Sequence, residues 1–203
     1  SSMTGGTERS KSINHNLARA ANEFKLGIGL GSCRSLLDSN SFIDDFNIRK
    51  ILGDDLPLFA NLGIVQIEEL VTSNKLYLLN EIVSKLSADG LIIHVNPLQE
   101  WFQEEGDRIT RPPIDTIKYV LDYVNFPIIV KEVGQGIGPK SLKALMQLPL
   151  AAIEFGAFGG TNFAKLELLR SEMSDNPLAL VGHSASEMVE IINKLVVELG
   201  SKL

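Results

Sequence analysis

Short apolar runs recur along this 203-residue chain, and each is followed by polar residues and then by a stretch with helical periodicity. With Ile28, Leu58, Leu91, Ile128 and Ala151 as markers, the runs lie 30, 33, 37 and 23 residues apart. This spacing is the length of a βα unit. The runs are continuous rather than alternating, which is typical of parallel strands that are covered on both faces. The sequence therefore predicts an α/β fold built from βα units.

Helical patterns fill the intervals between the runs. The last one is the best marked, because Ser184 and Glu187 form a capping box and Gly200 follows the apolar stripe that begins at Met188. Pro139 suits the first turn of another helix. We therefore expect a helix between consecutive strands and a further helix close to residue 200.

Polar residues follow the apolar runs, and Ser1 to Gly6 read as the tail of a strand that starts before the given sequence. In a (β/α)8 barrel the carboxyl ends of all strands converge on one face, which carries the active site. An open doubly wound sheet would gather only the strand ends near its switch point. We therefore predict a (β/α)8 TIM barrel, present as an incomplete barrel of about six βα units.

The heptapeptide His94 to Glu100 ends an apolar run with several polar side chains. Strand alternation places His94 and Asn96 on one face, and Pro97 turns the chain, so Gln99 and Glu100 should lie in the loop above that face. Such a cluster suits an anionic small molecule, with a hard cation on the carboxylate. A surface turn with incidental polar residues is the alternative.

Lys131 follows the run 128–130, and alternation puts it on the same face as Ile129, toward the predicted barrel interior. A buried ammonium group needs a partner. Glu132 is adjacent, but as the next residue of a strand it points the other way. The pattern favours an anionic ligand beside Lys131.

Other strand ends offer weaker signals. Ser32 and Arg34 suit phosphate oxygens, although Arg34 could instead pair with Asp38. Asn61 could pair with a heterocycle or cap a turn. Residues 159–162, Gly-Gly-Thr-Asn, aim free N–H groups at an anion or simply begin a helix. Residues 3–6, Met-Thr-Gly-Gly, offer backbone amides to a ligand or form a turn.

Composition excludes several classes of function. The net charge of −6 argues against nonspecific binding to nucleic acid, and no window approaches the ~20 apolar residues of a membrane helix. The single cysteine, Cys33, excludes an internal disulfide and fits a reducing cytoplasm. No HExxH spacing or Ser-His-Asp order suggests a hydrolase. We therefore expect a cytoplasmic protein with a small-molecule substrate.

Six motifs occur in the order and spacing of type 2 isopentenyl diphosphate isomerase, and the chain resembles that family over nearly its whole length. The heptapeptide and the Val-Lys-Glu-Val-Gly strand are the most specific of them. The motifs are Met3-Thr4-Gly5-Gly6, Gly31-Ser32-Cys33-Arg34, Ala60-Asn61-Leu62-Gly63, His94-Val95-Asn96-Pro97-Leu98-Gln99-Glu100, Val130-Lys131-Glu132-Val133-Gly134 and Gly159-Gly160-Thr161-Asn162.

The resemblance implies a flavin-containing barrel that interconverts isopentenyl and dimethylallyl diphosphate with reduced FMN, Mg²⁺ and NADPH as reductant. It implies that Gln99 faces the reacting carbons and, with His94, is catalytic, while Glu100 holds the metal. The substrate diphosphate would contact Ser32, Arg34, His94 and Asn96, with Gln99 also on the substrate. The flavin would be lined by Met3, Thr4, Gly5, Ser32, Asn61, Lys131 and Thr161.

The chain departs from the family pattern at both ends. The family's N-terminal segment and its last two strands are absent, so we expect residues 1–203 to be one FMN-binding barrel domain belonging to a longer chain. By resemblance we also expect a homo-oligomer, a tetramer or larger. The alternatives are an FMN-dependent 2-hydroxy acid oxidoreductase of the glycolate oxidase type and an inactive truncated homologue. The group Asn96, Gln99 and Glu100 favours the isomerase, because an amide and a metal ligand have no evident part in oxidising a hydroxy acid.

Overall fold

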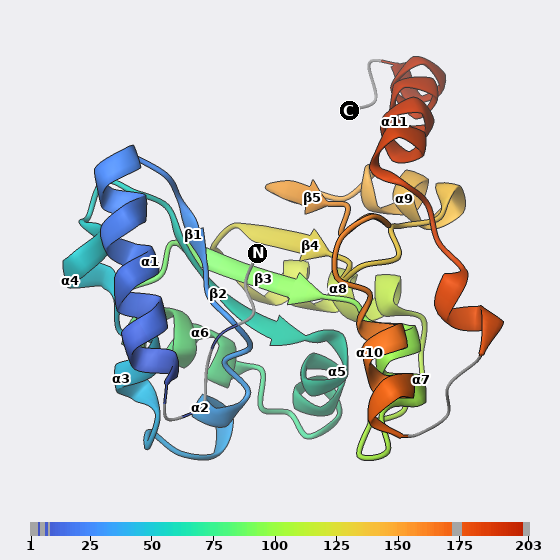
Figure 1. Cartoon of the computed structure of the whole chain (residues 1–203). Coiled ribbons are helices and arrows are strands. Elements are labelled where there is room, and N and C mark those ends of the chain that lie inside the picture. The colour runs from blue at the N-terminus through green and yellow to red at the C-terminus, as the bar shows by residue number, and fades with distance from the viewer. Residues whose placement is uncertain (1–3, 5–6, 8, 172–175, 201–203) are drawn as a thin grey trace. The chain divides into compact units, whose positions relative to one another are not determined.

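The computed structural model describes residues 4, 7, 9–171 and 176–200 (Figure 1). Its described residues form an α/β fold with one five-stranded sheet, in which the strand order β1-β2-β3-β4-β5 follows the chain. The β1–β2 and β4–β5 pairs are parallel, with Ile28 opposite Leu58 and Lys131 opposite Glu154. The predicted α/β class and all five predicted strands are confirmed.

The chain divides into two compact units. The first unit lies within Ser1–Ile93 and Val120–Ile128, and the second within His94–Tyr119 and Ile129–Leu203. Elements up to the end of β3 are α1 (Ser10–Phe24), β1 (Ile28–Gly29), α2 (Ser35–Asp38), α3 (Ile43–Phe46), α4 (Arg49–Leu52), β2 (Leu58–Gly63), α5 (Ile64–Thr72), α6 (Tyr77–Lys85) and β3 (Gly90–His94). Later elements are α7 (Pro97–Phe102), α8 (Pro113–Tyr123), β4 (Ile128–Lys131), α9 (Pro139–Leu145), β5 (Ala152–Glu154), α10 (Phe163–Arg170), the 3₁₀ helix η1 (Pro177–Leu180) and α11 (Ala185–Leu199).

The prediction of a (β/α)8 barrel with about six βα units is wrong for the described residues. They contain five strands and about five βα units, and β1 and β5 are the two edges of the sheet. The sixth unit was counted from residues 1–6, of which 1–3 and 5–6 lie outside the described residues, and Thr4 belongs to no strand. The spacing of apolar runs predicts how many strands form, but it does not show whether the edge strands pair to close a barrel.

The inner strands are buried and the edge strands are not. Leu58 and Leu62 of β2, and Leu91 and Ile93 of β3, are completely buried. In β5, by contrast, Ala152 and Glu154 are exposed. The continuous apolar runs therefore predicted burial correctly for the inner strands but not for the edges.

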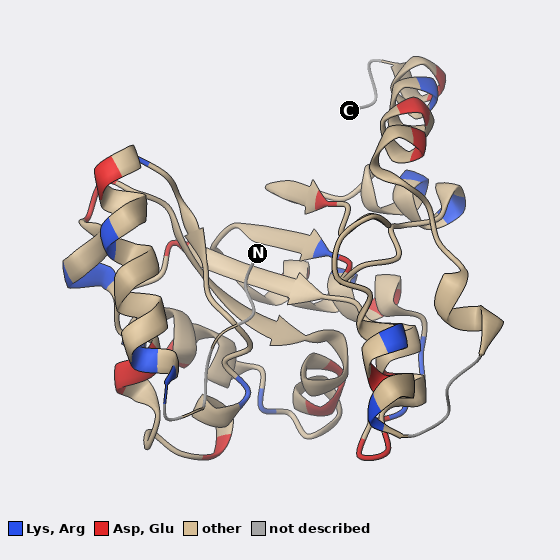
Figure 2. Cartoon of the chain, in the orientation of Figure 1, with Lys and Arg blue, Asp and Glu red and all other residues tan. Residues whose placement is uncertain are grey.

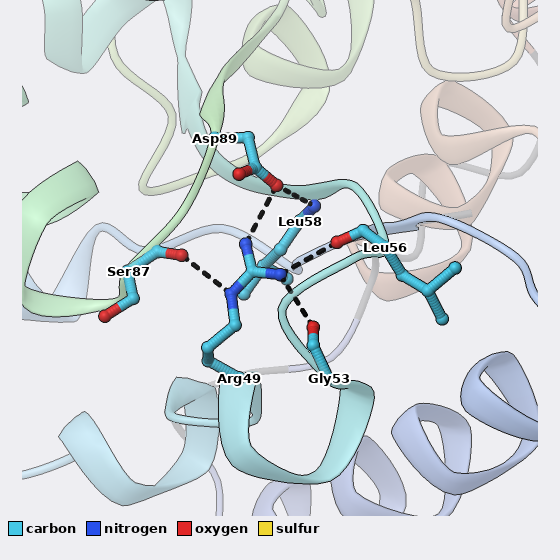
Figure 3. Close-up of polar contacts among 6 residues, drawn as sticks. All are labelled: Arg49, Gly53, Leu56, Leu58, Ser87 and Asp89. Carbon is cyan, nitrogen blue, oxygen red and sulfur yellow. Dashed lines mark hydrogen bonds and ion pairs between the residues drawn. The ribbon is translucent and has the colours of Figure 1, made fainter.

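An arginine network joins the loops at the start of β2 and β3 in the first unit (Figure 3). The guanidinium of Arg49 donates to the carbonyl oxygens of Ser87, Gly53 and Leu56 at 2.8, 3.0 and 2.8 Å, and it pairs with Asp89 at 2.8 Å. The same Asp89 oxygen accepts the Leu58 amide at 2.7 Å. Burial raises the pKa of Asp89, but these donors outweigh it, so the pKa is lowered. The network ties α4 to both strand starts.

In the second unit, α7 packs against α10. The buried residues Phe102, Ala164, Leu168 and Ala179 form one cluster, and Leu98 packs on it. Because Phe102 and Leu98 belong to α7, this apolar contact fixes the helix that carries Gln99 and Glu100.

The predicted cap of the last helix is confirmed. Ser184 Oγ accepts the Glu187 amide at 3.3 Å, and Glu187 Oε2 accepts the Ser184 amide at 2.7 Å. Gly200 ends the helix with a φ of +55°.

Charges are scattered over the chain. Basic and acidic residues are spread over many helices and loops rather than gathered on one element (Figure 2). None of the described helices combines the length and the apolar character that crossing a membrane requires.

Candidate functional site

The heptapeptide His94 to Glu100 forms a connected polar group at the carboxyl end of β3. Pro97 is the first residue of α7, so Gln99 and Glu100 lie in a helical turn and not in the predicted loop. The reason is that Pro at the first helical position starts a helix as readily as it ends a strand. Asn96 Nδ2 donates to Gln99 Oε1 at 3.1 Å and to Glu100 Oε1 at 3.0 Å.

Buried oxygen atoms give this group its chemical character. Asn96 is 3% exposed and Glu100 is 9% exposed. Among the described residues, the Asn96 Oδ1 atom is buried without a hydrogen-bond partner. A buried oxygen without a donor costs about 1–3 kcal/mol, so this position favours a donor such as water or a bound cation.

The second carboxylate oxygen of Glu100 is held by the loop after α7. Glu100 Oε2 accepts the backbone amide of Asp107 at 3.0 Å. Sequence reasoning missed Asp107, because the path of this loop is not set by any local periodicity.

His94 is the last residue of β3 and is partly buried. Burial, followed by the positive charge of Lys131, lowers its pKa to about 4. The imidazole is therefore neutral at pH 7 and can donate one hydrogen bond and accept another. It can bind an anion through its N–H, but it brings no charge of its own at that pH.

Lys131 is 6% exposed, and its ammonium donates to the backbone oxygen of Glu132 at 3.0 Å. Burial lowers its pKa, against the opposing effect of Glu154 and then Glu132. The Glu132 carboxylate is directed at backbone amides and not at the Lys131 ammonium, in agreement with the prediction that the Glu132 side chain points the other way. Its Oε2 accepts the amides of Gly134, Gln135 and Gly136 at 2.7, 2.6 and 3.1 Å. An ammonium with one backbone acceptor keeps donors for a further ligand.

Thr161 lies in the loop before α10 and is exposed. Gly159 and Gly160 precede it, and a Cβ added at either would meet nothing within 4 Å. Asn162 caps α10 through its Oδ1, which accepts the Lys165 amide at 2.9 Å. The backbone here is open to a ligand, while Asn162 performs the predicted structural role of a helix start.

The remaining predicted site residues belong to the first unit. Ser32 and Arg34 are exposed, and Ser32 Oγ accepts the Arg34 amide at 3.4 Å. Asn61 is 1% exposed and lies within β2, where its Nδ2 donates to the Leu30 carbonyl oxygen at 3.0 Å. Thr4 is partly buried and its carbonyl oxygen accepts Asn14 Nδ2 at 3.1 Å.

Two predicted flavin-lining residues, Met3 and Gly5, lie outside the described residues. Cys33 is completely buried, and burial raises the pKa of its thiol to about 12. A thiol that stays protonated at neutral pH is a poor nucleophile.

A cavity of about 780 Å³ lies in the second unit beside β4. Its wall is mainly apolar and comes from α8, α9 and the loops around them, with Lys131 and Glu132 among the few charged residues. Asn96, Gln99 and Glu100 do not line it. Nothing in the sequence pointed to this cavity, because apolar helix faces read as core.

The residues of the second unit fit a hard cation. Mg²⁺ is usually bound by one or two carboxylates, with water and phosphate oxygens completing an octahedral shell. Glu100 supplies a carboxylate, and the amide oxygens of Asn96 and Gln99 lie in the same turn. Among the described residues no group of three or more His, Cys, Asp or Glu side chains could hold a metal ion. A cation here would therefore depend on Glu100, with water or the oxygens of a bound ligand completing its shell.

Comparison with curated proteins finds relatives that share one name. The chain is 38% identical to the isopentenyl-diphosphate delta-isomerase of Rickettsia typhi, 39% to that of Rickettsia felis and 38% to that of Rickettsia prowazekii. Each match covers 174 residues, or 86% of this chain, and 49–50% of the relative. No protein-family model matches the chain. The chain spans about half the length of the curated relatives it matches, and over that half it is similar to isopentenyl-diphosphate delta-isomerases.

Proposed function

We propose that the full-length protein interconverts isopentenyl and dimethylallyl diphosphate in isoprenoid biosynthesis, as a type 2 isomerase that uses FMN and Mg²⁺. The identity of 38–39% to proteins named isopentenyl-diphosphate delta-isomerase supports the reaction. The observation that carries the proposal is the hydrogen-bonded group of buried Asn96 and Glu100 with partly buried Gln99, because its oxygens suit a cation bound to a diphosphate.

The reaction moves a double bond by one position. One proton is added at the terminal carbon of the double bond, and another is removed from the carbon two bonds away, which becomes part of the new double bond. The reaction therefore involves no net oxidation or reduction. Gln99 faces the reacting carbons in this proposal, and its side chain is oriented by the hydrogen bond from Asn96. Orientation of a bound substrate lowers the barrier by removing its translational and rotational freedom beforehand.

A metal ion and basic side chains would neutralise the charge of the diphosphate. Glu100 would hold Mg²⁺ and, through it, the diphosphate oxygens. The neutral His94 would donate an N–H, and Arg34 with Ser32 would provide charge and a hydroxyl. Each role is a prediction for one side chain, and substitution of that side chain tests it.

The flavin would be lined by Thr4, Ser32, Asn61, Lys131 and Thr161, together with Met3 and Gly5. Reduced FMN, when bound, supplies the proton donor and acceptor at the alkene, and NADPH is the proposed reductant. Lys131 would favour the anionic reduced flavin because its ammonium lies in a buried position, where charge interactions are strong. A homo-oligomer, a tetramer or larger, is part of the same proposal.

The test is to incubate the protein, at its full encoded length, with isopentenyl diphosphate, FMN, NADPH and Mg²⁺. We expect dimethylallyl diphosphate, and we expect none when FMN or Mg²⁺ is left out. Glu100→Gln should abolish turnover while the protein keeps its yellow flavin colour, and Glu69→Gln on the exposed part of α5 is the matched control. Loss of colour in Glu100→Gln would mean that the assigned role is wrong. Oxidation of a 2-hydroxy acid in place of isomerisation would favour the oxidoreductase.

A further inference from the structure

The loop after α7 approaches Glu100 at both its side chain and its backbone. Glu100 Oε2 accepts the Asp107 amide at 3.0 Å, while Oε1 accepts Asn96 Nδ2 at 3.0 Å. Each carboxylate oxygen is therefore held by one N–H and keeps a lone pair for another partner. The loop and the strand end together fix the plane of the carboxylate.

Gly106 makes this approach possible. A Cβ at position 106 would lie 2.1 Å from the Glu100 carbonyl oxygen and 2.9 Å from that of Gln103. The Gly106 amide donates to the Gln103 carbonyl oxygen at 3.0 Å, which closes a tight turn at the end of α7. Any side chain here would push the loop away from the helix, and the Asp107 amide would move with it.

Ion pairs anchor the same loop to α10. Arg170 pairs with Glu105 of the loop at 2.8 Å and with Glu167 of its own helix at 2.6 Å. Glu167 is only 5% exposed, so the inner end of this bridge is buried. On the other side of the turn, the Arg108 guanidinium lies 4.3 Å from the centre of the Trp101 ring.

Helix α10, which carries Arg170, packs against α7, which carries Glu100. Phe102 and Leu98 of α7 pack with Ala164 and Leu168 of α10. The loop is thus attached to both α7 and α10, and the apolar cluster holds these two helices together.

We infer that residues 103–108 are a positioning segment that sets the metal affinity of Glu100, and that Gly106 and Arg170 act on the metal through it. The inference rests on the proposed function, since it takes Glu100 as the metal ligand. Neither Gly106 nor Arg170 touches the metal or the substrate. Their effect passes through the Asp107 amide, which orients the carboxylate as an outer-shell donor orients a metal ligand.

The test measures Mn²⁺ binding by electron paramagnetic resonance in the protein at its full encoded length, with no substrate turnover involved. Wild-type protein should bind Mn²⁺, and Glu100→Gln should abolish that binding. Gly106→Ala should weaken it about tenfold or more, the range found when outer-shell partners of metal ligands are removed, because it displaces the Asp107 amide. Arg170→Ala should weaken it less, about twofold to fivefold, because the pair with Glu105 is exposed. Arg170→Lys, which keeps the charge, should recover part of the loss.

A matched control separates positioning from general destabilisation. Lys143 forms an exposed ion pair with Glu198 in the same unit, so Lys143→Ala removes a comparable surface contact far from Glu100 in sequence. Its Mn²⁺ affinity should equal that of the wild type. Circular dichroism of each variant checks that the protein tested is folded.

The outcomes distinguish this inference from the proposed function. Unchanged Mn²⁺ affinity in folded Gly106→Ala and Arg170→Ala would overturn the positioning role and leave the isomerase proposal intact. A wild type that binds no Mn²⁺ through Glu100 would overturn both. Weakened binding in the loop variants of a protein without isomerase activity would support the positioning role and remove the proposed function.

Discussion

Among the predicted site residues, His94 has a pKa far below its ordinary value. Its pKa of about 4 results first from burial and then from the positive charge of Lys131. In the unfolded chain the same group titrates at its ordinary value of 6.5. The unfolded state therefore takes up the proton first, and folding stability falls as the pH drops from 6.5 toward 4.

This difference predicts acid sensitivity. Between pH 7 and pH 5, His94 alone should lower the free energy of unfolding by about 2 kcal/mol, at ~1.4 kcal/mol for each unit of pKa difference. The measurement is urea denaturation at the two pH values. His94→Gln should lose that part of the pH dependence, while His15→Gln, at a histidine of α1, should keep it. Equal pH dependence in His94→Gln and the wild type would contradict the account.

Lys131 offers a second test at the residue scale. Its ammonium is buried and has a single backbone acceptor at 3.0 Å, so we expect it to hold an anionic flavin. Lys131→Met should weaken FMN binding at least tenfold, because the substitution keeps the length of the side chain and removes the charge. Quenching of FMN fluorescence measures the affinity, with Lys118→Met as the control, because Lys118 is exposed and does not line the cavity beside Lys131. Unchanged FMN affinity would place the flavin elsewhere.

Some site contacts could be predicted from the sequence and others could not. Asn96, Gln99 and Glu100 come within one turn of the chain, so local geometry alone brings them together. Asp107 reaches Glu100 only through the path of a loop, and Glu154 lies opposite Lys131 only through the sheet register. Long-range contacts of this kind leave no periodic signal.

At the scale of elements, the Arg49 network is the clearest structural device of the first unit (Figure 3). One half-exposed carboxylate, Asp89, and three carbonyl oxygens surround a guanidinium whose side chain is 9% exposed. The guanidinium satisfies four acceptors at once, one more than the three N–H groups of a lysine could.

Removal of this network should destabilise the protein. Arg49→Ala leaves three carbonyl oxygens without this donor and Asp89 with the Leu58 amide alone, so we expect a loss of about 3 kcal/mol in the free energy of unfolding. Lys85→Ala breaks an exposed i,i+4 pair with Glu81 and should cost no more than ~0.5 kcal/mol. Urea denaturation compares the two. Equal stabilities would show that the network contributes nothing beyond a surface ion pair.

The element scale also shows where periodicity misleads. In α1 the apolar residues Ile13 and Leu17 recur at helical spacing, yet they are 43% and 49% exposed, whereas Asn14 and Ala18 are buried. Asn14 Nδ2 donates to the Asp45 carbonyl oxygen at 2.7 Å, so a polar contact and a small side chain set the packed face. Periodicity identified the helix but not the side that packs. In α11, by contrast, the capping box and the buried Met188 follow the predicted pattern.

At the scale of the whole molecule, the sequence predicted each strand but not the architecture. The spacing of apolar runs depends on local chain length, and all five runs became strands. Closure of a sheet depends instead on whether its two edge strands pair, and the order β1-β2-β3-β4-β5 leaves both edges open in the described residues. No local pattern reports on such a pairing. The resemblance to a barrel family therefore went further than the strand pattern alone could support.

The proposed isomerisation adds a proton from solvent to the substrate without net oxidation or reduction, and one measurement tests this most directly. The full-length protein is incubated with isopentenyl diphosphate, FMN, NADPH and Mg²⁺ in deuterium oxide, and the products are followed by proton NMR. Isomerisation by proton addition and elimination predicts dimethylallyl diphosphate that carries solvent deuterium, with no stoichiometric consumption of NADPH. Absence of dimethylallyl diphosphate, or an unlabelled product formed with one NADPH consumed per turnover, would contradict the account.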